Sequence, residues 1–265
     1  ELGLKPYERR DQKLKETNCV LAAGSNYRTA AWSSLLLTHT YSSPATIHRD
    51  VKETGSKIAQ TNQNFEPEQA GKTEAQILYG ESDGVFVRLQ KDKNGKKFGE
   101  IRLGIAYTGK QWLSGNRYHL KNKVTIVGMD IDSLQWQEMI RNHLYATYDF
   151  NSIGLLAVGG DGGSWVGSTF DLCNVRKTER VLDKFHVKRA LRQAFGKSLD
   201  LNNDVYPKLF TEGLESIENL LCQQLEKGSY SEKNAKKACL KYLKNHEEEI
   251  LPLSQRCLPF PKLES

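Results

Sequence analysis

Apolar residues recur at two different spacings along the chain. Over residues 12–60 they recur at the three- and four-residue intervals of helices, whereas beyond residue 76 they alternate with polar residues, as in strands with one exposed face. The alternation predicts strands over 77–90, 99–109 and 123–128, and the Asn94-Gly95 pair predicts a hairpin turn between the first two.

Helical spacing returns at 133–148, where Leu134, Met139, Ile140 and Leu144 form the apolar stripe and Ser133 is the expected cap. The continuous apolar run "IGLLAVGGD" at 153–161 predicts a strand buried on both faces. Three antiparallel strands, a crossover helix and a fourth strand joined in parallel describe an α/β fold with a ribonuclease-H-like mixed sheet. The segment 180–196 begins as a strand and continues as a basic helix, and helices are expected at about 205–226 and 231–249.

The first part of the chain contains a well-marked helix start. In "TYSSPATIHRDVKETGSKI", Ser43 is the expected N-cap, Pro44 occupies the first helical position, and Ile47, Val51 and Ile58 form the stripe. A helix at about 26–37 precedes it, so the pair is a candidate helix-turn-helix, with a plain helical hairpin as the alternative. In the helix-turn-helix reading His48, Arg49 and Lys52 face DNA.

These patterns predict four parts along the chain. They are a helical DNA-binding region with its linker at 1–75, a ribonuclease-H-like core at 76–200, a helical insertion at 201–255, and the start of a final core segment at 256–265.

Composition narrows the function without deciding it. The 265 residues carry 38 Lys and Arg against 32 Asp and Glu, and the formal net charge of +6 favours a polyanionic partner. No apolar run approaches the roughly 20 residues of a membrane helix, and no signal peptide is visible, so we expect a cytoplasmic, nucleoid-associated protein without a membrane partner. The five cysteines lack the spacing of a structural zinc site and are expected to be reduced.

Two acids fall at neighbouring places in the expected sheet. Asp83 lies in the middle of the first strand and Asp161 at the end of the fourth. Two adjacent carboxylates repel each other unless a cation lies between them, and oxygen ligands suit Mg²⁺, with Mn²⁺ as a substitute. Such a site can catalyse phosphoryl transfer. The four glycines around Asp161 would let a phosphodiester approach, or they form only a tight turn.

Five segments together resemble a known family. They are "LGLKPYERR" (2–10), "SDGVFVRLQ" (82–90), "GGDGGSWV" (159–166), "LDKFHVKRAL" (182–191) and "LPFPKLES" (258–265), and they extend over nearly the whole chain. Their order and spacing are similar to those of bacterial insertion-sequence DDE transposases of the ISLre type, which are distantly similar to Mutator-like elements.

The resemblance implies a catalytic triad. In that family an Asp-Gly on the first strand and a Gly-Asp-Gly on the fourth supply two metal-binding carboxylates, which correspond to Asp83 and Asp161, and a Glu in an "ES" motif supplies the third, which corresponds to Glu264. Family members continue with an Arg-rich stretch that is missing here, so the chain is expected to be a fragment. "LDKFH" resembles the C/D-x-x-H element of Mutator-like transposases, which implies a role for His186 at the active site; the alternative is a surface histidine.

Basic and aromatic residues near these acids are candidates for DNA contact. Lys188 and Arg192 follow "LDKFH" on the basic helix, although charged runs on helices are usually solvated faces. Trp165 follows Asp161 and would stack on a displaced base, or it belongs to the core.

The resulting hypothesis is a DNA transposase that hydrolyses a phosphodiester at the element ends and transfers the strand to target DNA. Its partner is double-stranded DNA and no small-molecule substrate is expected, and the resemblance implies a homodimer. Two alternatives stay open: an inactive transposase-derived DNA-binding protein, and a ribonuclease-H-fold nuclease without strand transfer.

Overall fold

The computed structural model describes residues 10–89, 97–115 and 117–258. The chain folds as two compact units that divide between Phe65 and Glu66. Within the described ranges no helix combines the length and the apolar character needed to cross a membrane.

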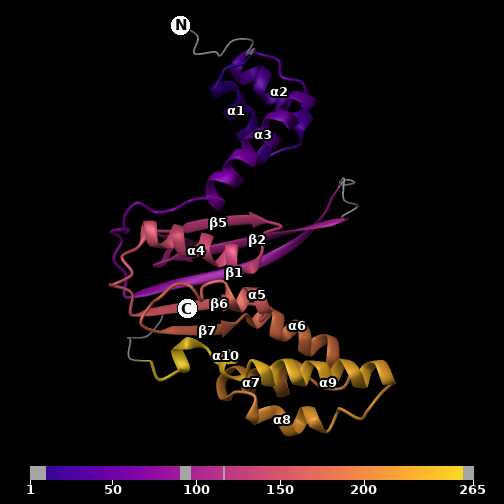
Figure 1. Cartoon of the computed structure of the whole chain (residues 1–265). Coiled ribbons are helices and arrows are strands. Elements are labelled where there is room, and N and C mark those ends of the chain that lie inside the picture. Colours follow the sequence, from indigo (N-terminus) through magenta and orange to yellow (C-terminus); the bar gives the residue numbers. More distant parts are fainter. Residues whose placement is uncertain (1–9, 90–96, 116, 259–265) are drawn as a thin grey trace. The chain divides into compact units, whose positions relative to one another are not determined.

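Three helices make up the N-terminal unit, as the helical spacing predicts. They are α1 (Gln12–Ala23), α2 (Tyr27–Thr38) and α3 (Pro44–Gln63) (Figure 1). The side chain of Ser43 accepts the Thr46 N–H and Pro44 opens α3, which confirms the expected helix start. Ala30, Ala31 and Ile47 form its small buried core. The structure does not test whether α2 and α3 act as a helix-turn-helix.

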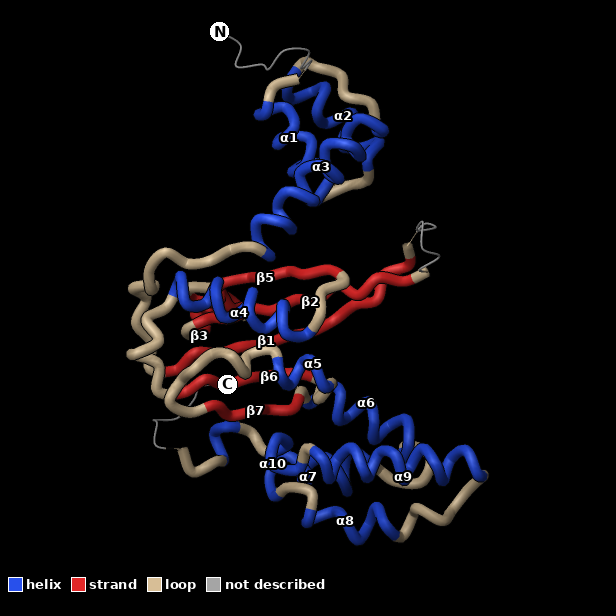
Figure 2. The backbone as a smooth tube through the Cα atoms, in the orientation of Figure 1, coloured by secondary structure: helices blue, strands red, loops and turns tan. Residues whose placement is uncertain are grey.

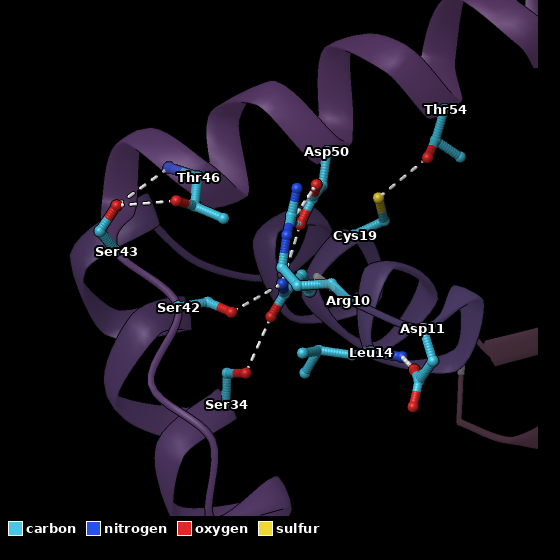
Figure 3. Close-up of polar contacts among 11 residues, drawn as sticks. Arg10, Asp11, Leu14, Cys19, Ser34, Ser42, Ser43, Thr46, Asp50 and Thr54 are labelled. Atoms are coloured by element: carbon cyan, nitrogen blue, oxygen red, sulfur yellow. Dashed lines mark hydrogen bonds and ion pairs between the residues drawn. The ribbon is translucent and has the colours of Figure 1, made fainter. Parts of the chain in front are cut away.

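A buried polar network joins these three helices (Figure 3). Asn18 donates to Ser42 at 3.1 Å and to Asp50 at 2.9 Å, and it accepts a hydrogen bond from Ser34 at 2.8 Å. Arg10 forms an ion pair with Asp50. Since burying an unpaired polar group costs free energy, this set of matched partners favours one arrangement of the helices.

The second unit is built on a five-stranded sheet (Figure 2). Its strands run in the order β5-β2-β1-β6-β7; β1 pairs with β2 and β2 with β5 in antiparallel, while β1 pairs with β6 and β6 with β7 in parallel. Their bounds are β1 (Ile77–Arg88), β2 (Phe98–Tyr107), β5 (Val124–Met129), β6 (Leu155–Gly160) and β7 (Thr178–Leu182). The expected three antiparallel strands and the parallel fourth strand are confirmed. The Asn94-Gly95 turn lies outside the described residues.

The sequence analysis missed one hairpin and misplaced one cap. A two-stranded antiparallel hairpin of β3 (Gly109–Ser114) and β4 (Arg117–Lys121) stands between β2 and β5. Helix α4 (Ser133–Thr147) is capped by Asp132, whose side chain accepts the N–H groups of Leu134 and Gln135, and not by Ser133.

The two faces of the sheet differ in their cover. Helix α4 and the short α5 (Ser164–Ser168) pack on one face, where a Cβ at Gly104 or Gly128 would meet the side chain of Trp136. On the opposite face of β2 and β5, Leu103 and Val127 are exposed. The odd-numbered residues of β1 and β2 share this less covered face.

Residues 66–75, expected to form a linker, lie along the second unit. Gly71 donates to the Tyr145 carbonyl at 2.8 Å, and Thr73 donates to the Thr147 carbonyl at 3.2 Å. A Cβ at Gly71 would come within 2.0 Å of the Thr147 backbone. The segment is therefore fitted closely to the end of α4.

Helices form the C-terminal part of the second unit, but with more breaks than the spacing predicts. The long helix expected at 205–226 is a π-helical turn (Leu201–Val205), α7 (Tyr206–Glu212) and α8 (Glu215–Cys222), because Gly213 has a φ of 91° and ends α7. The helix expected at 231–249 is α9 (Tyr230–Asn245) and α10 (Glu247–Ile250). Together with α6 (Lys184–Phe195) these helices enclose an apolar core of their own.

The buried network of the N-terminal unit yields a stability prediction. Asn18→Ala leaves Ser34 and Asp50 without a partner each, so we expect the free energy of unfolding of α1–α3 to fall by about 1–3 kcal/mol. Amide hydrogen exchange of these helices in the full chain measures it. Glu16→Ala, at an exposed position of the same helix, is the control and should change it by less than about 0.5 kcal/mol. Equal effects of the two substitutions would contradict the role given to Asn18.

Candidate active site

The pairing of β1 with β6 brings the two predicted aspartates together. Glu81 is paired with Gly159 in this parallel register, so Asp83 and Asp161, two residues further along each segment, are level and on the same face. The next pair of strands extends the row: Gly160 is paired with Leu182, and the N–H of Asp183 donates to the Gly160 carbonyl at 2.8 Å. Three aspartates therefore follow one another across three neighbouring strands.

A cavity of about 730 Å³ opens along this row. We call it the acidic cavity, after the four acids that line it: Glu81, Asp83, Asp161 and Asp183. Two lysines, Lys110 and Lys184, also line it, together with His186 and Ser254. Acids and cations therefore border the same space, as a site for a metal-bound phosphate requires.

Each central carboxylate is held by one of its oxygens. Asp83 accepts the N–H of Gly84 at 2.7 Å, and Asp161 accepts the N–H of Gly163 at 2.8 Å, in both cases through Oδ1. Among the described residues no cation lies within ion-pair distance of either carboxylate. One oxygen of each is therefore oriented by the backbone, and the other is left for a ligand.

The third aspartate of the row has a structural task. Asp183 caps α6 by accepting the Phe185 N–H at 2.8 Å, and its second oxygen lies 3.8 Å from Nε2 of His186. The sequence prediction that Asp183 and His186 approach the same site agrees with their place in the wall of the acidic cavity. What His186 does there is not tested by this geometry.

Glu81, which the sequence analysis did not single out, also faces the acidic cavity. It accepts a hydrogen bond from the hydroxyl of Tyr107 at 2.6 Å, across the β1–β2 pair. Burial raises the pKa of Tyr107, and the hydrogen bond to Glu81 raises it further. The tyrosine thus remains a donor at neutral pH, and Glu81 is held against β2.

The glycines around Asp161 make room mainly for protein atoms. A Cβ at Gly160 would lie 2.4 Å from Val166, and one at Gly162, whose φ is 82°, would lie 3.0 Å from both His246 and Leu182. Only Gly159 faces Glu81 on the cavity side, with 3.4 Å to spare. The expectation that all four glycines clear a path for a phosphodiester is therefore wrong for Gly160 and Gly162.

Helix α9 contacts the loop that carries Asp161. Its Tyr242 hydroxyl donates to the main-chain carbonyl of Asp161 at 3.0 Å. Burial raises the pKa of Tyr242 to about 12, with a further contribution from the charge of Asp161, so the hydroxyl stays protonated at neutral pH. His246 lies beside Gly162 and contacts Glu249 through Nδ1 at 3.0 Å. No local motif announces these contacts, because they join segments about eighty residues apart.

The end of the described chain passes the same cavity. Arg256 forms an ion pair with Glu179 of β7 at 2.7 Å and donates to the Leu251 carbonyl, and Ser254 lines the acidic cavity. The neighbouring Lys177 and Arg256 lower the pKa of Glu179 against the opposing effect of its burial. Glu264, the third acid that the family resemblance implies, lies outside the described residues.

The basic residues near the site differ from those expected. The ammonium of Lys188 lies 5.2 Å from the ring centre of Tyr206 and 5.7 Å from that of Phe210, so it packs on the helical part and does not line the acidic cavity. Arg192 lines a second cavity further along α6. The cations at the acidic cavity are Lys110, from the hairpin that the analysis missed, and Lys184.

Trp165 lies on the opposite face of the sheet. Arg102 stacks on its ring at 4.6 Å, Trp136 meets it edge to face, and a Cβ at Gly84 would come within 2.6 Å of it. The residue belongs to the packing under α4, and the expectation that it stacks on a base at the site is not supported by this position. The alternative reading as a core residue fits.

In the N-terminal unit, the three expected DNA-facing residues are exposed on α3. His48, Arg49 and Lys52 all point away from the buried core, and His48 packs edge to face on Tyr27 at 5.4 Å. Their exposure is compatible with DNA contact, which the structure does not test.

The acids form a pair more than a complete metal site. Within the described ranges no three His, Cys, Asp or Glu side chains converge closely enough to hold a metal ion. Asp83 and Asp161 offer two oxygen donors that are free of cations, and oxygen donors of this kind suit a hard divalent ion.

Comparison with known proteins gives a family and two similar proteins. A family model described as "Uncharacterised protein family (UPF0236)" matches residues 1–256. A "UPF0236 protein in vanSb 3'region" from Streptococcus gallolyticus is 27% identical over 263 residues, which cover 97% of this chain and 56% of that protein. The chain thus spans little more than half the length of this relative. A solved structure, the Drosophila P element transposase strand transfer complex, is similar with a TM-score of 0.36 and 11% identity, covering 90% of this chain and 58% of that one.

The loop after β6 yields a prediction with an internal control. Gly162→Ala forces a side chain into a left-handed conformation against His246, so we expect the free energy of unfolding to fall by about 1–2 kcal/mol. Gly167→Ala, in α5 with open space around it, should raise that free energy by about 0.5–1 kcal/mol. Urea denaturation of the full chain measures both, and effects of the same sign would contradict this account of the loop.

Proposed function

The chain belongs to the UPF0236 family, and we propose that it is the core of a DNA transposase that carries out metal-dependent phosphodiester hydrolysis and strand transfer. The single observation that carries the proposal is the level placement of Asp83 and Asp161 on neighbouring parallel segments in one cavity.

We propose that the sheet is ribonuclease-H-like. The supporting feature is its topology: three antiparallel strands in the order β5-β2-β1, followed through α4 by two parallel strands, β6 and β7. In this arrangement the carboxyl ends of β6 and β7 lie beside the middle of β1, which is where the acids are. The fold alone does not imply the chemistry, so the proposal depends on the acids themselves.

We infer that Asp83 and Asp161 hold Mg²⁺, for which Mn²⁺ can substitute. Each has one carboxylate oxygen fixed by a backbone N–H and the other free of cations among the described residues. When bound, such an ion stabilises the developing negative charge of a phosphoryl-transfer reaction and lowers the pKa of an attacking water. Glu264 is proposed as the third acid; it follows Ser254, a residue of the cavity wall, by ten residues.

The chain's own residues have three further tasks in this proposal. Tyr242 holds the main chain at Asp161 and so fixes the direction of that carboxylate. Lys110 and Lys184 offer positive charge to the phosphates on either side of the scissile bond. His186, held near Asp183, is a donor within the cavity wall that can contact the scissile phosphate.

The wider activity of the protein is part of the same proposal. Exposed residues of α3, His48, Arg49 and Lys52, are proposed to contact duplex DNA, and a homodimer is proposed to hold two element ends. These steps rest on the motif resemblance and on the basic net charge of the chain.

The metal-binding role of the two aspartates predicts a selective loss of chemistry. In the full-length protein, Asp83→Asn or Asp161→Asn should lower Mg²⁺-dependent cleavage of DNA that flanks its own gene by at least about a thousandfold. Affinity for the same DNA should stay within about threefold, because the exchanged groups are acids and not phosphate ligands. Gel assays of nicking and joining measure the first quantity, and fluorescence anisotropy measures the second.

The matched control is Asp171→Asn, which alters an exposed aspartate paired with Arg180 and outside the acidic cavity. Its cleavage rate should equal that of the unaltered protein. Full cleavage by either cavity variant would refute the assignment. Cleavage without any joining of ends would instead favour a nuclease without strand transfer.

The hydrogen bond from Tyr242 predicts a smaller effect at a distance from the acids. Tyr242→Phe removes only the donor to Asp161, so we expect kcat to fall about three- to tenfold at unchanged KM for DNA, and the half-saturating Mn²⁺ concentration to rise. Tyr230→Phe, on the same helix with a side chain 82% exposed, is the control. Unchanged Mn²⁺ dependence in the Tyr242 variant would show that the contact is structural only.

A further inference from the structure

A second cavity, of about 580 Å³, lies between the last turn of α6 and the connection from α8 to α9. Four cations line it: Arg192, Lys197, Lys227 and Lys236. Its one acid is Glu232. We call it the basic cavity.

The acid of the basic cavity is already engaged. Glu232 accepts the N–H of Ser229 at 2.8 Å and its hydroxyl at 2.9 Å, in the capping box that starts α9. It neutralises at most one of the four positive charges, so the cavity carries a net positive charge of about three at neutral pH.

The lysines of this region fall into two groups. On the outer surface of α9, Lys233 and Lys237 form ion pairs with Glu226, and Lys244 forms one with Glu218. Among the described residues, by contrast, Arg192, Lys197 and Lys227 have no carboxylate within ion-pair distance. The positive charges left unpaired are therefore the ones that share a cavity.

Lys236 is the most unusual of the four. It is only 5% exposed, and its ammonium donates to the Lys227 carbonyl at 2.7 Å. An ammonium has three N–H donors, and a buried charge without a carboxylate partner is costly. A bound anion in the cavity would supply the missing negative charge.

We propose that the basic cavity binds backbone phosphates of the same DNA duplex whose scissile phosphodiester lies at the acidic cavity. The inference rests on the proposed function and deepens it. Helix α6 links the two sites, because it starts at Asp183 in the wall of the acidic cavity and carries Arg192 nine residues later, about 14 Å along its axis. Since phosphates of one strand rise about 3.4 Å per nucleotide, the second contact falls about four nucleotides from the cleavage point.

The test measures the salt dependence of DNA binding in the full chain. Asp83→Asn is the background, so that the labelled duplex stays intact, and Arg192→Gln with Lys197→Gln removes two exposed cations of the basic cavity. Fluorescence anisotropy should show a loss of affinity of about tenfold or more near 0.1 M salt, and the slope of log K against log salt should fall by about 1.8, or 0.9 for each phosphate contact.

The matched control replaces Lys233 and Lys237 with Gln, which removes two positive charges that are paired with Glu226 outside the basic cavity. Its slope should fall by less than about half as much as that of the cavity variant. Equal slopes for the cavity variant and the background protein would overturn the inference and leave the proposed function standing. No duplex binding by the background protein would overturn both.

A small phosphate-bearing ligand is the other source of the same chemistry. Titration with inorganic phosphate at constant ionic strength, followed by thermal unfolding, separates the two. If the cavity substitutions abolish a phosphate-dependent stabilisation but leave the DNA slope unchanged, the cavity binds a free anion and the proposed duplex contact is wrong.

Discussion

The parallel pairing of β1 with β6 is the constraint on which the site depends. Its register fixes Glu81 opposite Gly159, and because side chains alternate along a strand, Asp83 and Asp161 must then lie level on one face. A shift of one residue would send one carboxylate to the face that α4 covers. The apolar run of β6, buried between α5 and the C-terminal helices, holds that register, so packing on both sides of the strand determines the chemistry at its end.

The helices after β7 take part in the site more directly than a mere insertion would. Tyr242 reaches back to the Asp161 main chain, and His246 occupies the space that the missing side chain of Gly162 leaves. Their apolar core, formed with α6, also encloses the basic cavity on its other side. One helical body thus supports the acidic loop at one end of α6 and presents unpaired cations at the other. This arrangement suits a long polyanion better than a small substrate.

The sequence predicted the parts of this account that depend on local pattern. Alternation gave the strands, and the position of each acid within its strand was enough to infer that Asp83 and Asp161 are neighbours. Contacts between distant segments left no such mark. The spacing of Lys188 placed it on the basic helix, but not against the rings of Tyr206 and Phe210, and Trp165 followed Asp161 in sequence while packing on the opposite face. Direction in three dimensions, which depends on what packs beside a residue, accounts for both errors.

The central claim is that two carboxylates hold one divalent ion, and anomalous scattering from crystals of the full-length protein soaked in Mn²⁺ tests it most directly. The account predicts a strong peak that bridges the side chains of Asp83 and Asp161, with oxygen ligands at about 2.0–2.3 Å. A peak that contacts neither aspartate, or carboxylates that point apart at saturating Mn²⁺, would contradict it.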